Sequence, residues 1–248
     1  MHRFFIKKQD IESDSVTIEG NIAHQIFKVL RLVKGDYITV MDGTNWEYRI
    51  ILDEIDPRRI LGTIVEKSRC QGEPKYPIAL YQGILKSHKF EMVLQKGTEL
   101  GITRFVPVIC ERTIPRGDVL SFDRKLDRYM TIVREAAEQS HRGVIPVIGK
   151  TLPLAEAFRI SGGRRIILWE KEKALGISDQ LNDKAPYTSQ GISLFVGPEG
   201  GFTNREIRCS VNYGLIPVTL GKRILRAETA SLAAIVLVLS SLGEFKGQ

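Results

Sequence analysis

The stretch 196–229 decides how the chain folds, because it holds the turns Val196-Gly197-Pro198-Glu199-Gly200-Gly201 and Leu220-Gly221-Lys222-Arg223-Ile224-Leu225-Arg226-Ala227-Glu228-Thr229. Each turn directly follows a predicted strand, Ile192–Val196 or Val218–Leu220. In an open α/β sheet, ligands bind at the carboxyl ends of the strands. Glycines have no side chain, so backbone groups can approach a ligand closely. Taken alone, the same turns would serve equally well as tight strand-to-helix connections.

Outward from these turns, residues 73–248 alternate between predicted strands and helices. The strands are expected at 78–82, 105–109, 165–169, 192–196 and 218–220. This alternation predicts an α/β fold with a mostly parallel sheet covered by helices. Thr203 and Glu206 have the spacing of a capping box at the start of one helix. The last helix, about 229–242, is apolar nearly all round, which predicts burial in the core or against a second subunit.

The first part of the chain has a different pattern. Five short strands are expected at 2–6, 16–18, 37–41, 47–52 and 60–65, and such spacing is typical of a small β-barrel. Turn formers and polar residues then concentrate between Cys70 and Pro77. We therefore predict two domains, a small barrel over 1–72 and an α/β domain over 73–248.

Charge and composition restrict the partners and the location. The 248 residues include 36 Lys and Arg against 29 Asp and Glu, a formal charge of +7 that favours an anionic partner such as nucleic acid. A merely soluble basic protein would have the same composition. No export signal is predicted, because charge returns after three apolar residues at the N-terminus. No membrane span is predicted either, since the apolar run Ala233–Leu239 is far shorter than the roughly 20 residues a span needs. Three isolated cysteines indicate free thiols in a reducing cytoplasm, and four scattered histidines predict no metal site.

Several common site motifs are missing from the sequence. No GxGxxG follows a strand, and no GxxxxGK[ST] is present to bind phosphates. GxSxG and HExxH are missing as well, which disfavours hydrolases and zinc enzymes. The two glycine turns are therefore the best candidates for a ligand site.

Read together, GPEGG at 197–201 and LGKRILRAETA at 220–230 resemble the cofactor-binding end of the SPOUT methyltransferases, and specifically the RsmE family. That family methylates N3 of a uridine in 16S ribosomal RNA of the small subunit. The resemblance runs nearly the full length. Arg3-Phe4-Phe5 and the block 24–36 are similar to the family's PUA-like RNA-binding domain, and its central motifs resemble Lys86, Lys89, 95–101 and 135–142. One departure follows Arg142, where the family usually carries a second basic residue and this chain reads Gly143-Val144-Ile145-Pro146.

The resemblance implies a fold and a cofactor. The expected fold is a SPOUT-type α/β domain with a deep trefoil knot, preceded by a PUA-like β-barrel, in a homodimer. The implied cofactor is S-adenosyl-L-methionine. Its predicted contacts are Val196, Gly197, Pro198, Glu199, Gly200, Gly201, Leu220, Gly221, Ile224, Leu225, Ala227 and Thr229.

The resemblance also suggests roles for charged residues. Arg226, directly after the cofactor wall, is predicted to stabilise negative charge on the uracil or to hold a phosphate, and Glu228 to orient Arg226 or accept a proton. Equally, the two can simply pair at the start of the last helix. The predicted RNA contacts are the basic residues Arg3, Arg31, Lys86, Lys89, Lys96, Arg112 and Arg142. Two other functions remain open, a non-catalytic RNA-binding or ribosome-assembly factor and a small-molecule transferase.

Overall fold

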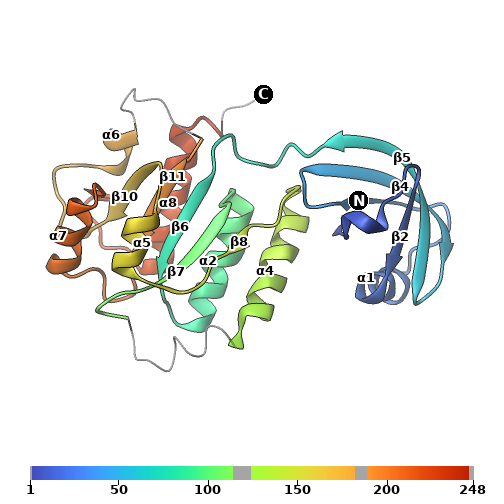
Figure 1. Ribbon diagram of the computed structural model, residues 1–248, viewed down its shortest axis with the longest axis horizontal. Coiled ribbons are helices and arrows are strands. Elements are labelled where there is room, and N and C mark those ends of the chain that lie inside the picture. Colours follow the sequence, from blue (N-terminus) through green and yellow to red (C-terminus); the bar gives the residue numbers. More distant parts are fainter. Residues whose placement is uncertain (1, 114–123, 182–188, 246–248) are drawn as a thin grey trace. The chain divides into compact units, whose positions relative to one another are not determined.

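The structure, a computed structural model, describes residues 2–113, 124–181 and 189–245 (Figure 1). The chain forms two compact units. The N-terminal unit comprises residues 1–73 together with 137–145, and the C-terminal unit comprises 74–136 and 146–248.

Strands dominate the N-terminal unit. Its elements are β1 (Arg3–Phe5), a 3-10 turn (Lys8–Asp10), β2 (Ser15–Glu19), α1 (Gly20–His24) with a π-helical extension (Gln25–Val29), β3 (Tyr37–Met41), β4 (Trp46–Ile55) and β5 (Arg59–Arg69). Among the described residues, five strands pair in the order β1-β3-β4-β5-β2, with β1 parallel to β3 and the other pairs antiparallel. Alternate residues of each strand point to one side, where Ile18, Val40 and Ile50 are buried with Ala23 and Ile26 of the helical segment.

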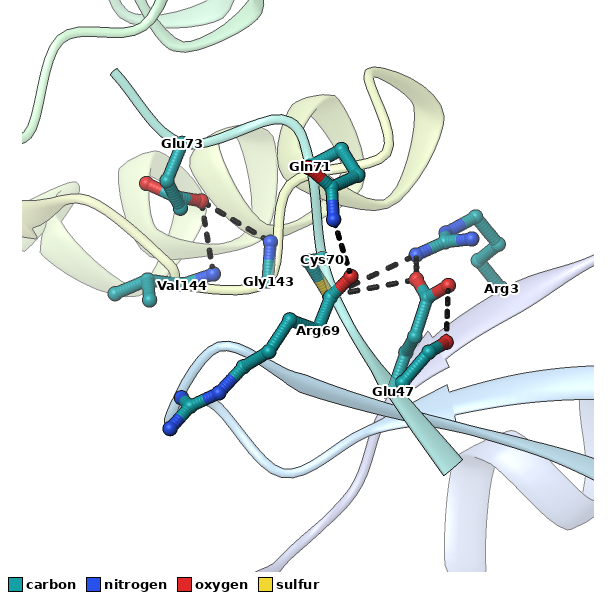
Figure 2. Close-up of polar contacts among 9 residues, drawn as sticks. Arg3, Glu47, Arg69, Cys70, Gln71, Glu73, Gly143 and Val144 are labelled. Carbon is teal, nitrogen blue, oxygen red and sulfur yellow. Dashed lines mark hydrogen bonds and ion pairs between the residues drawn. The ribbon is translucent and has the colours of Figure 1, made fainter. Parts of the chain in front are cut away.

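A segment from the middle of the chain, 137–145, belongs to the N-terminal unit, which the sequence did not predict. The Glu73 carboxylate accepts hydrogen bonds from the backbone amides of Gly143 (3.0 Å) and Val144 (3.1 Å), drawn in Figure 2, and from the Arg142 guanidinium (2.7 Å). Gly143 has no room for a side chain, because a Cβ there would lie 2.6 Å from the sulfur of Cys70. These contacts fix the segment in place.

The C-terminal unit is built on a parallel sheet, as the sequence predicted. Its elements are β6 (Ile78–Gly83), α2 (Ser87–Leu100), β7 (Arg104–Ile109), α4 (Leu126–Gln139), β8 (Val147–Ile148), β9 (Leu152–Pro153), α5 (Leu154–Ile160), β10 (Arg164–Leu168), α6 (Ile177–Leu181), β11 (Ile192–Val196), α7 (Asn204–Asn212), β12 (Ile216–Val218) and α8 (Ala227–Ser241). Within the described residues the strand order is β12-β10-β11-β6-β7-β8, with β9 beside β7, and each of these pairs is parallel. β11 is buried along its whole length, as expected for a strand covered on both faces.

Helices cover the two faces of this sheet (Figure 1). Tyr81, Ile167 and Phe195 pack with Phe158 of α5 and Ile207 of α7 in one apolar cluster. On the other face, α8 packs against α2 and α6. α8 buries one side of its surface, yet Val236 on its outer side is 38% exposed, so this apolar helix is only partly covered. No helix in the described parts of the chain is long and apolar enough to cross a membrane.

Candidate functional site

A pocket of about 240 Å³ lies at the carboxyl ends of three neighbouring strands of the C-terminal unit. Three loops form its wall, because parallel strands end at the same edge of the sheet. The lining residues are 168–170 after β10, 196–202 after β11 and 218–225 after β12, with Ala227 and Ala230 of α8. Both glycine turns that stand out in the sequence therefore meet in one pocket.

The predicted cofactor contacts lie mainly in this wall. The residues that line the pocket are Val196, Gly197, Pro198, Glu199, Gly200, Gly201, Leu220, Gly221, Ile224, Leu225 and Ala227. Ile224 is 84% exposed, so its side chain stands at the open side of the pocket. Thr229 does not line this pocket and borders an apolar groove along α8 instead.

Glycines bring the backbone of the first turn close to its neighbours. A Cβ on Gly197 would lie 3.2 Å from the backbone of Gly201 and 3.3 Å from the ring of Phe202. A Cβ on Gly83, the last residue of β6, would lie 2.4 Å from the backbone nitrogen of Pro198. Gly83 was not among the predicted site residues, although its position at the end of a predicted strand is a signal that points to the site.

A buried glutamine donates hydrogen bonds to the same turn. Gln82 is fully buried, and its amide nitrogen donates to the carbonyl oxygens of Gly83 (3.1 Å) and Gly197 (3.3 Å). The Ser231 hydroxyl of α8 donates to the Gln82 amide oxygen at 2.5 Å. This side chain thus joins the end of β6, the first glycine turn and the start of α8.

A second set of hydrogen bonds links the first glycine turn to α7 and to the loop after β7. Glu206 and Thr203 form the predicted capping box of α7, in which the Glu206 carboxylate accepts from the Thr203 amide at 2.7 Å. The other carboxylate oxygen accepts from the Glu111 amide at 2.8 Å, in the loop after β7. In that loop the Arg112 guanidinium donates to the carbonyl oxygen of Gly200 at 2.8 Å. The exposed Arg112 side chain is therefore held at the pocket.

Two pocket residues after β10 were missed in the sequence. Trp169 lines the pocket, and its indole nitrogen is buried without a hydrogen-bond partner among the described residues. Buried donors are normally paired, so this N–H lacks the partner that a buried donor usually has. The Glu170 carboxylate lies next to Gly201, 3.2 Å from where a Cβ would stand. The signal was present, because the predicted strand 165–169 ends at these residues.

The two predicted catalytic residues have different surroundings. Arg226 is exposed at the N-cap of α8, next to Leu225 of the pocket wall. The Glu228 carboxylate lies 3.3 Å from the Lys89 ammonium, which is also 3.6 Å from Glu199. Burial alone would raise the pKa of Glu228, but hydrogen bonds from its own amide and from Lys89, with the nearby charges of Lys89 and Arg226, hold it below the ordinary value. Glu228 is therefore ionised at neutral pH.

The basic residues predicted to contact RNA differ in how far their side chains are exposed. Arg31, Lys86 and Arg112 are exposed, and Lys96 is half-exposed in an ion pair with Glu99. The Lys89 side chain is only 18% exposed and lies close to the carboxylates of Glu199 and Glu228.

Two further candidates, Arg142 and Arg3, lie within the N-terminal unit. Arg142 is 1% exposed and paired with Glu73, and Arg3 pairs with Glu47 close to Cys70 (Figure 2). Both guanidinium groups are paired with carboxylates and little exposed, so the exposed cations are the better candidates for RNA contacts. The Cys70 thiol beside them is inert, since burial and the adjacent Glu47 raise its pKa to about 12.

The positive charge of the chain is unevenly distributed. Residues 1–73 carry 11 Lys and Arg and 12 Asp and Glu, so they are nearly neutral. The excess that gives the whole chain a charge of +7 therefore lies beyond residue 73. Attraction for a polyanion is concentrated in the part of the chain that carries the pocket.

Known proteins resemble the chain over nearly its whole length. The sequence profile of a family described as an RNA methyltransferase domain matches residues 72–239. The ribosomal RNA small subunit methyltransferase E of Synechocystis is 33% identical over 96% of this chain and 77% of its own length. The protein of the same name from Bacillus subtilis is 28% identical over 95% of this chain and 94% of its own. The crystal structure of a ribosomal RNA small subunit methyltransferase E from Neisseria gonorrhoeae, bound to S-adenosyl methionine, has a TM-score of 0.85 at 31% identity and covers 97% of both chains.

Proposed function

Because the chain belongs to the RNA methyltransferase family that these proteins represent, we propose that it transfers a methyl group from S-adenosylmethionine to N3 of a uridine in 16S ribosomal RNA. The observation that carries the proposal is the pocket that the two glycine turns form at one edge of the parallel sheet. A site of this kind suits a nucleoside cofactor, since backbone groups and apolar side chains line it together. The rival function, a non-catalytic assembly factor, gives no reason for this pocket.

The groups that line the pocket suit the cofactor. The unpartnered indole N–H of Trp169 and the backbone of Gly197 and Gly201 suit the polar edges of adenine and ribose. Leu220 and Leu225 supply apolar cover. The Glu170 carboxylate at the rim suits the positive charges of the methionine part. When bound, the cofactor supplies an electrophilic methyl group on a sulfonium.

The chain's own groups position and stabilise the reacting uracil. Uridine N3 is a weak acid, so negative charge develops on the ring as its proton leaves to water. N3 then forms a bond to the methyl carbon while the bond from that carbon to the sulfonium sulfur breaks. We assign stabilisation of this charge to the exposed Arg226 guanidinium at the N-cap of α8. Glu228 is an orienting residue in this scheme, because a carboxylate with a lowered pKa and a Lys89 partner is a poor proton acceptor.

The rest of the assembly follows from the same family. We propose that the C-terminal unit contains the trefoil knot of the SPOUT proteins and that the five-stranded N-terminal sheet belongs to a PUA-like barrel. We further propose that the protein acts on the small ribosomal subunit as a homodimer in the cytoplasm. The exposed cations Arg31, Lys86 and Arg112, with the half-exposed Lys96, are the proposed RNA contacts.

Titration calorimetry and RNA methylation together test this function. Arg226→Ala is expected to lower turnover on small-subunit RNA about 100-fold, a typical cost of losing one charge-stabilising donor. Cofactor affinity should change by less than about twofold, because Arg226 lies outside the pocket lining. Arg205→Ala is the matched control, since it removes an arginine that is 85% exposed on α7.

The outcomes separate the proposal from its rivals. A folded wild-type protein that does not bind S-adenosylmethionine would exclude the methyltransferase function. If Arg226→Ala weakens cofactor affinity but keeps the wild-type turnover at saturating cofactor, the role given to this arginine is contradicted. Mass-spectrometric mapping of 16S RNA from a deletion strain identifies the nucleotide, and unmodified uridine N3 is the expected change.

A further inference from the structure

Lys89, in the first turn of α2, reaches carboxylates from two different parts of the chain. Its ammonium nitrogen lies 3.6 Å from an oxygen of Glu199, in the first glycine turn. It also lies 3.3 Å from an oxygen of Glu228, in the first turn of α8. The two glutamate side chains are only 21% and 12% exposed, so water screens these ion pairs weakly. One ammonium therefore links the first glycine turn to the second, which ends at Thr229.

The Glu199 carboxylate has a second contact with the start of α2. The oxygen that faces Lys89 also accepts a hydrogen bond, 3.3 Å long, from the backbone amide of Lys86, the N-cap of α2. Unpaired amides at a helix N-terminus favour a negative charge. Because Glu199 also lines the pocket, α2 acts on the cofactor wall through this one side chain.

Glu228 connects Lys89 to Arg226, the residue assigned to charge stabilisation. Burial tends to raise the pKa of Glu228, whereas its own amide, Lys89 and the Arg226 charge lower it. The carboxylate is therefore negative at neutral pH and attracts both cations. Arg226 is exposed at the N-cap of α8, so this attraction restricts where its guanidinium can lie. Lys89 fixes Glu228, and Glu228 in turn orients Arg226.

The surroundings of Lys89 do not suit a contact with RNA. Lys89 is not among the described residues that line the pocket, and a phosphate at its ammonium would meet two carboxylates. Lys86, three residues earlier, is exposed. Lys86 therefore remains a proposed RNA contact, whereas the charge of Lys89 is used within the protein.

We propose that Lys89 is a positioning residue that aligns the cofactor wall with Arg226 through its two glutamate partners. Its effect on the reaction rests on the proposed function, whereas the ion pairs themselves do not. Without the ammonium, Glu199 and Glu228 repel each other where little water screens them. The first turn then moves away from the cofactor, and Arg226 loses its alignment with the uracil. Loss of Lys89 thus lowers both cofactor affinity and turnover, whereas loss of Arg226 lowers turnover alone.

Lys89→Met tests this role, because it removes the charge and keeps an unbranched side chain. Affinity for S-adenosylmethionine, measured by calorimetry, should fall at least about fivefold as the pocket wall loses its support. Turnover at saturating cofactor should fall at least about tenfold, since small displacements of a group at the reacting atoms are costly. The slope of RNA affinity against salt concentration should stay that of wild type, because no phosphate contact is lost.

Lys86→Met is the matched control, three residues away and exposed. It should reduce the salt slope by about one, as expected for one lost phosphate contact, and leave cofactor affinity unchanged. A reduced salt slope in Lys89→Met, with wild-type cofactor affinity, would overturn the inference and make Lys89 an RNA contact. RNA affinity is measured without cofactor, so this comparison is decisive even if the wild-type protein methylates no uridine.

A double variant tests whether Lys89 acts through Glu228. In Lys89→Met combined with Glu228→Gln, the repelling charges are gone, so the protein should fold even if Lys89→Met alone does not. Its turnover at saturating cofactor should lie within about twofold of that of Glu228→Gln, because the ion pair is already lost in the single variant. If the two substitutions instead multiply their losses of turnover, Lys89 acts independently of Glu228 and the inference is wrong.

Discussion

At Gly83 the absence of a side chain decides the shape of the pocket. A Cβ at this residue would lie 2.4 Å from the nitrogen of Pro198 and 2.8 Å from the carbonyl carbon of Gly197, both backbone atoms that cannot move alone. Gly83→Ala must therefore displace the first glycine turn. We expect cofactor affinity, measured by calorimetry, to fall at least about tenfold, as a site held to less than 1 Å loses its geometry.

A matched glycine substitution gives the control. At Gly149 a Cβ would be 3.5 Å from its nearest neighbours, an ordinary contact, and Gly149→Ala should leave cofactor affinity unchanged. Melting temperatures of both variants separate displacement of the turn from general loss of stability. Equal cofactor affinity in Gly83→Ala and wild type would show that the turn does not form the binding wall.

At the level of residues, local signals in the sequence point to residues that line the pocket. Gly197 and Gly201 stand directly after a strand, and glycine is informative there because backbone approach requires it. Arg142 shows the opposite case, since its charge suggested a surface role and its burial depends on Glu73, far away in the sequence. A single charged residue carries no sign of the partner that the fold will give it.

At the level of elements, Glu206 connects α7 to the loop after β7. Its carboxylate accepts one bond from Thr203 and another from Glu111, and a glutamine can accept only one of these. Glu206→Gln should lower the free energy of unfolding by about 1–3 kcal/mol. It should also raise the KM for S-adenosylmethionine several-fold, because Arg112 and the Gly200 carbonyl lose their support.

Thr203→Ala is the control for this tie. It removes the hydroxyl that accepts from the Glu206 amide, at a cost of about 1 kcal/mol, and leaves the bond to Glu111 in place. Unfolding in denaturant and steady-state kinetics should therefore show a stability loss in both variants and a KM change only in Glu206→Gln. Similar KM values in the two variants would mean that the β7 loop does not act on the pocket.

The segment 137–145 provides a second test at this scale. Removing one partner of a buried ion pair typically costs about 3–5 kcal/mol, because the other charge stays buried. Arg142→Ala should lower the free energy of unfolding by this amount, while RNA affinity of the folded fraction stays within twofold of wild type. A large loss of RNA affinity at unchanged stability would restore Arg142 as an RNA contact.

Elements were predicted from the sequence more fully than the contacts between them. The strand before the first turn and the capping box of α7 are read from spacing within a few residues. The last strand was predicted at 218–220, and β12 instead covers Ile216–Val218. The bond from Glu206 to Glu111 spans 95 residues, and the bonds from Glu73 to Gly143 and Val144 span about 70. Periodicity contains no information on such pairs. The Glu206–Glu111 hydrogen bond and the position of 137–145 could therefore be seen only in the structure.

For the whole molecule, the outer face of α8 is the surface from which the proposed dimer can be tested. Met92 of α2 and Leu232, Val236 and Leu237 of α8 line an apolar groove of about 480 Å³ that ends at Glu228 and Thr229. A continuous apolar surface of this kind normally marks an interface. In a two-fold dimer the same groove would meet its copy, so each groove would cover the other.

Val236→Arg should therefore convert the proposed dimer to a monomer, because a charge on the groove of both copies must be desolvated in the interface. Light scattering at working concentration measures the mass directly. Val211→Arg on α7 is the control, since Val211 is an exposed apolar residue of the same unit, 52% accessible, outside the groove. Glu228 borders the groove and pairs with Lys89, and Lys89 also pairs with Glu199 of the pocket. We therefore expect the monomeric variant to lose methylation activity as well as the second subunit. A wild-type monomer, or a Val236→Arg dimer with full activity, would refute this arrangement.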